Sequence, residues 1–113
     1  MFRGGHWELS DLLEIAPFVD AIETFNSRCM DMTPNLKALE FARVQHLSGT
    51  AGSDAHTTLE LGSACLELDE FSNADDLRRV IVSARQNVRL SSPFIHLSSR
   101  YATIVKQLGL VKI

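Results

Sequence analysis

Hydrophobic positions along the chain alternate between short continuous runs and helical stripes. Runs of apolar or small residues predict strands at 19–25, 47–53, 64–68 and 87–90. Stripes spaced three or four residues apart predict helices at 11–16, 34–45, 73–85 and 93–108. Strands and helices therefore alternate with short connections, which favours an α/β fold with a largely parallel sheet.

Capping signals predict where these helices begin. Ser10 and Thr33 each place a hydroxyl just before a helical stripe, and Pro34 follows Thr33 at the first helical position. Thr57-x-x-Glu60 and Ser72-x-x-Asp75 each match a capping box. The first box predicts a single helical turn, and the second predicts the start of a longer helix.

Composition indicates one ordinary globular domain. The chain has 113 residues, of which 45% are hydrophobic and 22% charged. No apolar run approaches the roughly 20 residues that a membrane span needs, and the first residues lack the apolar core of a signal peptide. Cys29 and Cys65 form no disulfide framework or zinc-knuckle spacing, so both are expected to be buried and reduced, in a cytoplasmic protein.

Charge is distributed unevenly. Residues 1–73 hold 4 basic and 12 acidic side chains, whereas residues 74–113 hold 7 basic and 2 acidic ones. A basic end can indicate contact with phosphate or nucleic acid, but it can equally form solvated helix faces. The basic residues are spread out with no aromatic platform among them, so the second interpretation is favoured and nucleic acid is not an expected partner.

The stretch "GTAGSDAHTTLELG" at 49–62 carries the candidate chemistry. Asp54 and His56 stand two apart, which on an extended segment points both side chains to one face. A carboxylate and a neutral imidazole on one face can ligate Zn²⁺, Mn²⁺ or Fe. Short motifs also arise by chance, so on composition alone a solvated pair in a loop explains the pattern as well.

The surrounding segments resemble a known family. "VDAIETFNSR" at 19–28, "NLKALEFAR" at 35–43 and "GTAGSDAHTTLELGSA" at 49–64 resemble, in order and spacing, the C-terminal part of the PHP (polymerase and histidinol phosphatase) family, especially its stand-alone metal-dependent phosphoesterases. The C-terminal "SPFIHLSSR" is also similar. The resemblance covers essentially the whole chain, and Gly-Ser-Asp-Ala-His at 52–56 is its most specific element.

The resemblance implies a fold and an activity. PHP domains are distorted (β/α)7 barrels that hold two or three metal ions at the carboxyl ends of their strands and hydrolyse phosphate esters of small molecules with metal-activated water. On that model Asp54 and His56 are the catalytic metal ligands, and Asn26 and Arg28 contact the substrate. For Glu23, which lies inside the predicted strand, a structural hydrogen bond is at least as good an interpretation as a role in the site.

The chain also departs from the family pattern. PHP domains begin with a His-x-His strand, and this chain contains no such motif. His6 is the candidate substitute ligand, although a surface loop histidine is the commoner case; His46 and His96 are expected to be ordinary surface or packing residues. The whole chain, 1–113, is therefore expected to be one partial domain, the C-terminal half of a PHP barrel with short parallel strands alternating with helices.

Half a barrel leaves an open strand edge and an uncovered apolar face. We therefore expect a homo-oligomer, most simply a dimer, that buries these exposed surfaces. Two ligands also fall short of the three that catalytic zinc normally has. The expectation is therefore a phosphoesterase fragment that is weak or inactive alone, and the alternative is a non-catalytic remnant that acts as an oligomerising or interaction module.

Overall fold

A parallel βαβ unit forms the centre of the structure. The computed structural model describes residues 7–94 and 104–109. Strand β1 (Ala21–Asn26) pairs in parallel with β2 (Ser48–Gly52), and helix α2 (Thr33–Val44) connects them. The register aligns the start of β1 with the start of β2 and slips by one residue after Glu23. Both strands therefore end at the same edge of the sheet, where Asn26 lies opposite Gly52.

The start of α2 differs from the predicted cap. Met32, not Thr33, is the N-cap residue, and no side chain caps the helix. The Oδ1 atom of Asp31 instead accepts a hydrogen bond from the Thr33 N–H at 2.7 Å. Pro34 lies in the first turn as predicted, where its missing N–H costs no hydrogen bond.

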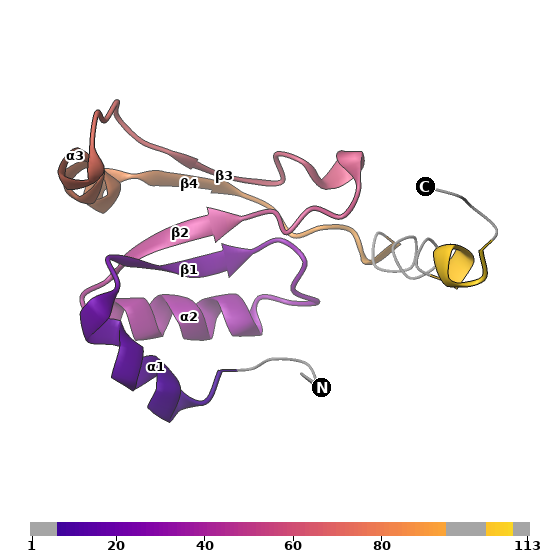
Figure 1. Cartoon of the computed structure of the whole chain (residues 1–113), viewed down its shortest axis with the longest axis horizontal. Coiled ribbons are helices and arrows are strands. Elements are labelled where there is room, and N and C mark those ends of the chain that lie inside the picture. The colour runs from indigo at the N-terminus through magenta and orange to yellow at the C-terminus, as the bar shows by residue number, and fades with distance from the viewer. Residues whose placement is uncertain (1–6, 95–103, 110–113) are drawn as a thin grey trace.

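A second unit is an antiparallel hairpin. Strand β3 (Ala64–Glu67) pairs antiparallel with β4 (Arg85–Val88), and between them lie helix α3 (Ala74–Val80) and the 3-10 turn η3 (Ile81–Ser83). The prediction of parallel strands is therefore wrong for this pair. The short helix lies at the end of the hairpin and reverses the chain, rather than running back along β3 as a parallel crossover requires (Figure 1). The half-barrel itself stays a prediction.

The cap of α3 lies one residue beyond the predicted position. Asn73, rather than Ser72, is the N-cap residue, and its side chain accepts a hydrogen bond from the Asp76 N–H at 2.9 Å. The helix also ends at Val80, before the predicted end at Arg85, and Arg85 begins β4.

The hairpin is attached to the parallel pair by specific polar contacts. The Gln86 side chain donates to the Thr24 hydroxyl at 2.9 Å and to the Thr50 carbonyl at 3.3 Å. In Figure 1 the hairpin and α2 lie on opposite sides of the parallel pair. The hairpin and helix α2 therefore cover the β1–β2 pair from opposite sides.

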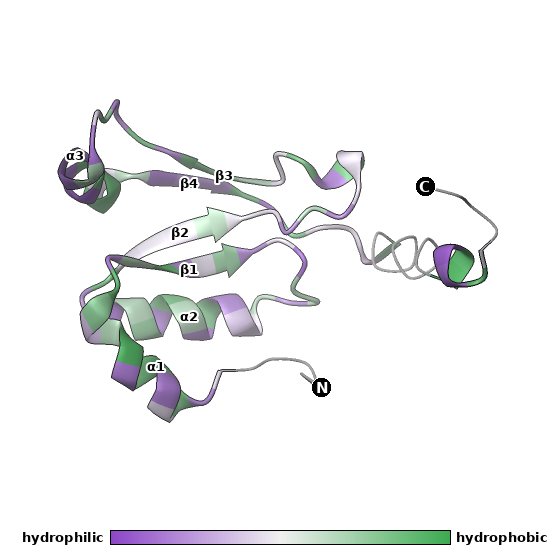
Figure 2. Ribbon diagram, in the orientation of Figure 1, coloured by the Kyte–Doolittle hydropathy of each residue, from purple (hydrophilic) through white to green (hydrophobic). Residues whose placement is uncertain are grey.

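Helix α1 (Leu9–Ile15) precedes this arrangement and continues into the 3-10 turn η1 (Ala16–Phe18). Its N-cap is Glu8 and no side chain caps it, so the predicted Ser10 cap is wrong and Ser10 lies within the helix. No residue of α1 is buried. Figure 2 shows hydrophobic residues along this helix, in contrast to the mostly hydrophilic β4.

The buried set is small and unusually polar. Among the described residues, the buried apolar side chains are Ala16, Phe25, Ala42 and Val80. The buried polar ones are Thr24, Ser27, Asn35, Glu60 and Ser63. A globular domain normally buries mainly aliphatic and aromatic side chains, so hydrogen bonding must fix much of this interior.

The C-terminal part is described only in pieces. The backbone is helical at residues 93–94 and 104–107, and the rest of the predicted last helix lies outside the described residues. Within the described part of the chain, no helix has the length and apolar character needed to cross a bilayer.

Candidate metal-binding site

Asp54, His56 and Asn26 come together where the two parallel strands end. Asn26 ends β1, and the loop after β2 carries Asp54 and His56. The Asn26 Nδ2 atom donates to Asp54 Oδ2 at 3.3 Å, and Asp54 Oδ1 lies 3.4 Å from His56 Nε2. The side chains of Asp54 and His56 are 48% and 57% exposed, so solvent and solutes reach both.

The extended geometry predicted from the sequence is not what brings Asp54 and His56 together. Asp54 has φ +50°, in the left-handed region, which an extended segment never visits. Non-glycine residues adopt this region rarely, with Asp, Asn and His the most tolerant. The loop therefore turns sharply at Asp54, and this turn brings its carboxylate toward His56.

Glu60 holds the loop in this conformation from below. Its side chain is fully buried, and Oε2 accepts hydrogen bonds from the N–H groups of His56 at 2.9 Å and Thr57 at 2.8 Å. The Thr57 hydroxyl also donates to Oε2, at 3.0 Å. This confirms the predicted capping box of Thr57 and Glu60, around the 3-10 turn η2 (Thr58–Glu60). The box reaches one residue farther than expected, to the backbone of His56.

The other oxygen of Glu60 forms an ion pair with Arg28. The Arg28 guanidinium is bonded to Glu60 Oε1, and the Arg28 side chain is only 10% exposed. Arg28, just after β1, and Glu60, just after the site loop, are thus joined across the sheet edge. The prediction placed Arg28 at the rim as a phosphate contact; the structure places its guanidinium against a buried carboxylate.

The environment of Glu60 favours its ionised form. Burial alone would raise the pKa of Glu60, but the N–H groups of His56 and Thr57, the Thr57 hydroxyl and the Arg28 guanidinium together lower that pKa below its ordinary value. A carboxylate with this many donors stays charged at neutral pH. Glu60 therefore acts as an anchor for the site loop that is ionised at neutral pH.

Asn35 and Asn26 fix the end of β1. The buried side-chain amide of Asn35 accepts from the Asn26 N–H at 2.9 Å and donates to the Asn26 carbonyl at 3.2 Å. The Asn26 side chain accepts from the Arg28 N–H at 2.8 Å through Oδ1, which leaves its Nδ2 facing Asp54. Asn26 is thus oriented from both its backbone and its side chain.

Glu23 and Gly52 lie against each other beside the site. A Cβ atom on Gly52 would stand 2.1 Å from Glu23 Oε1, so the carboxylate occupies the space that a side chain would need. The predicted structural hydrogen bond of Glu23 is not among the described contacts. The missing side chain of Gly52 is what lets this carboxylate lie over the end of β2.

The two cysteines differ from each other. Cys29 is half-buried; burial raises the pKa of its thiol, and the carboxylates of Glu23, Asp31 and Asp54 raise it further. The raised pKa favours the neutral thiol over the thiolate at neutral pH. Cys65 is exposed, so the prediction that it is buried is wrong.

The histidines predicted outside the pair contribute nothing described to the site. His6 and His96 lie outside the described residues. His46 follows α2 with φ +56°, where it ends the helix. Among residues 7–94 and 104–109, no group of three or more His, Cys, Asp or Glu side chains is arranged to hold a metal ion.

Comparison with known proteins finds a matching family model. Residues 33–85 match the family model described as PHP-associated, a segment that runs from α2 to the start of β4 and contains Asp54, His56 and Glu60. This match confirms the resemblance to the C-terminal region of PHP proteins.

One relative is similar over part of its length. An uncharacterized protein of Methanocaldococcus jannaschii is 42% identical over 66 residues, which make up 57% of this chain. The match spans 28% of the length of that relative. No solved structure matches the chain significantly.

The structure brings together Asp54, His56 and Asn26, which the sequence had singled out. The pairing of Glu60 with Arg28 was not predicted. The available signal was the capping box, which predicted that the Glu60 side chain bonds the backbone of Thr57. Nothing in the spacing of Arg28 and Glu60, 32 positions apart, indicates that they meet.

Proposed function

We propose that this chain contributes a metal half-site to a metal-dependent phosphoesterase of the PHP type. Asp54 and His56 are the proposed ligands for Zn²⁺, Mn²⁺ or Fe, with small phosphate esters as substrates. When bound, the ion supplies Lewis-acid activation of the ester and of water. The proposal rests on the PHP-associated match over 33–85 and on the geometry of the pair.

The distance between the two donor atoms carries the proposal. Two ligands that each lie about 2.0–2.1 Å from a tetrahedral zinc are about 3.3–3.4 Å apart. The Asp54 Oδ1 and His56 Nε2 atoms are 3.4 Å apart. Asn26 bonds the other oxygen of Asp54, so Oδ1 is the oxygen left to face a ligand beside His56.

The remaining residues act on the pair rather than on a substrate. Glu60 fixes the loop through the His56 N–H, and Asn26 orients the Asp54 carboxylate. Arg28 pairs with the buried carboxylate of Glu60, and this contact links it to the site loop. Arg28 is therefore better proposed as a residue that positions the site loop.

Two ligands make a weak site. Structural zinc sites with four ligands bind with about 10–16 kcal/mol, so two ligands should supply roughly half of this, a Kd between about 1 and 200 μM. The chain alone should accordingly hydrolyse phosphate esters slowly or not at all. Any full activity would need further ligands from outside the described residues.

Isothermal titration of the untagged chain with Zn²⁺ and Mn²⁺ tests the proposal. We expect one site in this affinity range, at least tenfold weaker in Asp54→Ala and in His56→Ala. Asp69→Ala, a change to an exposed carboxylate away from the pair, is the control. Binding that is unchanged in both site variants would refute the assignment.

The alternative is a non-catalytic interaction module. It is favoured by the finding that the described residues hold no group of three potential ligands. Hydrolysis of p-nitrophenyl phosphate in the presence of Mn²⁺ separates the two functions. Turnover that disappears in Asp54→Ala supports a phosphoesterase, whereas the absence of both metal binding and turnover supports the module.

A further inference from the structure

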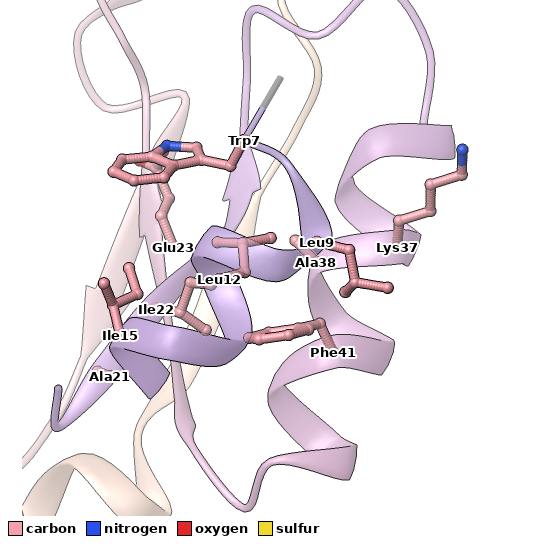
Figure 3. Close-up of a pocket in the computed structure, with 10 residues that line it drawn as sticks. All are labelled: Trp7, Leu9, Leu12, Ile15, Ala21, Ile22, Glu23, Lys37, Ala38 and Phe41. Carbon is pink, nitrogen blue, oxygen red and sulfur yellow. The ribbon is translucent and has the colours of Figure 1, made fainter. Parts of the chain in front are cut away.

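An apolar groove of about 730 Å³ lies between α1, β1 and α2 (Figure 3). Leu12 and Ile15 line it from α1, Ile22 lines it from β1, and Phe41 lines it from α2, with Trp7 beside the start of α1. The proposed metal pair, Asp54 and His56, is not part of its lining. Glu23 is the lining residue that also lies beside the site, against Gly52.

The side chains around this groove are left uncovered by the described residues. Trp7 is 66% exposed, Leu9 61% and Leu13 47%, and α1 buries no residue. An amphipathic helix normally owes its stability to the apolar face that it packs away from water. Among the described residues, helix α1 therefore lacks the buried apolar face that normally stabilises such a helix.

Strand β1 borders the groove along an edge that no other described strand occupies. It pairs only with β2 in the described sheet. The Asn35 amide closes this edge at Asn26, as described above. The segment Ala21–Glu23, which lines the groove, has no such cover among the described residues. Open edges of this kind favour association.

Two opposite charges stand at the rims of the groove. Glu23 lies on the β1 side and Lys37 on the α2 side, with Ala38 and Leu12 between them in Figure 3. Neither forms an ion pair within the described residues. In a twofold interface the same patch meets itself, so residue i of one copy contacts residue j of the other, and the reverse. A patch with one acidic and one basic rim is complementary to itself.

We propose that the occupant of this groove is a second copy of the chain. In the resulting symmetric dimer, the apolar face of α1 in each copy covers the groove of the other copy. Glu23 of each copy pairs with Lys37 of the other. This association does not depend on the metal chemistry proposed above.

Charge exchange tests the pairing directly in the full chain. Light scattering after size-exclusion chromatography, at about 10 μM protein, should give the mass of a dimer. Glu23→Lys and Lys37→Glu each place like charges together, and each should raise the dimer Kd by about tenfold or more. The double variant should restore it to within about threefold of the original chain.

Two controls separate association from folding and from net charge. Glu70→Lys changes the net charge as Glu23→Lys does, but it lies in the loop after β3, away from the groove, so it should leave the dimer unchanged. Circular dichroism of each variant should match that of the original chain. A folded monomer at 10 μM, or a dimer that neither single exchange weakens, overturns the proposal. So does a double variant that stays as weak as the single ones.

Discussion

Asn35 completes both backbone hydrogen bonds of Asn26 with one side chain. Its Oδ1 accepts at 2.9 Å and its Nδ2 donates at 3.2 Å, and the residue is only 4% exposed. The amide thus substitutes for a neighbouring strand at the position where β1 ends. Because Asn26 also bonds Asp54, this contact transmits the position of α2 to the candidate metal site.

Replacing Asn35 should therefore weaken the fold and disturb the site together. Asn35→Leu leaves the N–H and C=O of Asn26 without partners, and each unsatisfied group costs about 1–3 kcal/mol. We expect at least about 1 kcal/mol lower free energy of unfolding in urea. Asn87→Leu, at an exposed position of β4, should change it by less than about 0.5 kcal/mol. Equal effects of the two changes would contradict this role of Asn35.

Acid should weaken the fold through Glu60. Its pKa is lowered in the folded state, so the unfolded chain binds the proton more readily, and stability rises with pH in the acidic range. The contribution is complete above the unfolded pKa of about 4.3 and is lost as pH falls through the lower, folded pKa. Urea unfolding between pH 3 and 7 should show this loss.

The variant Glu60→Gln should reduce that slope as well as the stability at pH 7. Part of the slope should remain, because hydrogen bonds from Thr33 and Arg43 also lower the pKa values of Asp31 and Glu40. The control is Glu67→Gln, which removes an exposed ion pair with Arg85 and should have little effect at any pH. An unchanged slope in Glu60→Gln would argue against the anchor.

Two glycines of β2 should respond differently to alanine. A Cβ at Gly49 would lie 2.5 Å from Oγ1 of Thr24, a short and buried side chain that already bonds Thr50 and Gln86. Gly49→Ala should cost about 1–3 kcal/mol, as overpacking does. Gly52→Ala displaces only the flexible end of Glu23 and should cost less. Thermal unfolding of both variants gives the comparison, and the reverse order would contradict it.

The left-handed backbone of Asp54 predicts a separation of stability from metal binding. Asp54→Asn and Asp54→Gly keep residue types that tolerate φ +50°, so their unfolding free energy should change by less than about 0.5 kcal/mol. Asp54→Ala should lose about 1 kcal/mol. All three should lose metal affinity in calorimetric titration. An alanine variant as stable as the glycine variant would show that the left-handed backbone at position 54 carries no cost for alanine.

The central βαβ unit could be predicted because its signals are local. The apolar run before Asn26, the Thr33-Pro34 pair and the small residues of β2 each lie within the element that they specify. The capping box at Thr57 and Glu60 was predicted for the same reason. Antiparallel pairing of β3 and β4 could not be predicted, since strand direction depends on how the chain turns around α3.

The inner half of the site also escaped prediction. Glu60 and Arg28 meet only because parallel strands end at one edge, and neither residue type is expected to be buried without a partner. Asp54 and His56 were predicted on the assumption of an extended segment, yet a left-handed residue brings them together. The residue types indicated the chemistry, and the long-range contacts determined the geometry.

The Glu60 anchor has a consequence for protein design. Its contacts to Arg28, His56 and Thr57 order the site loop before any ion arrives. A ligand added to such a frame spends none of its binding energy on arranging the loop. Asn26, whose amide already touches Asp54, is the natural position for a third donor. The substitution Asn26→Asp would test whether a third donor is enough to complete a metal site on this preorganised loop.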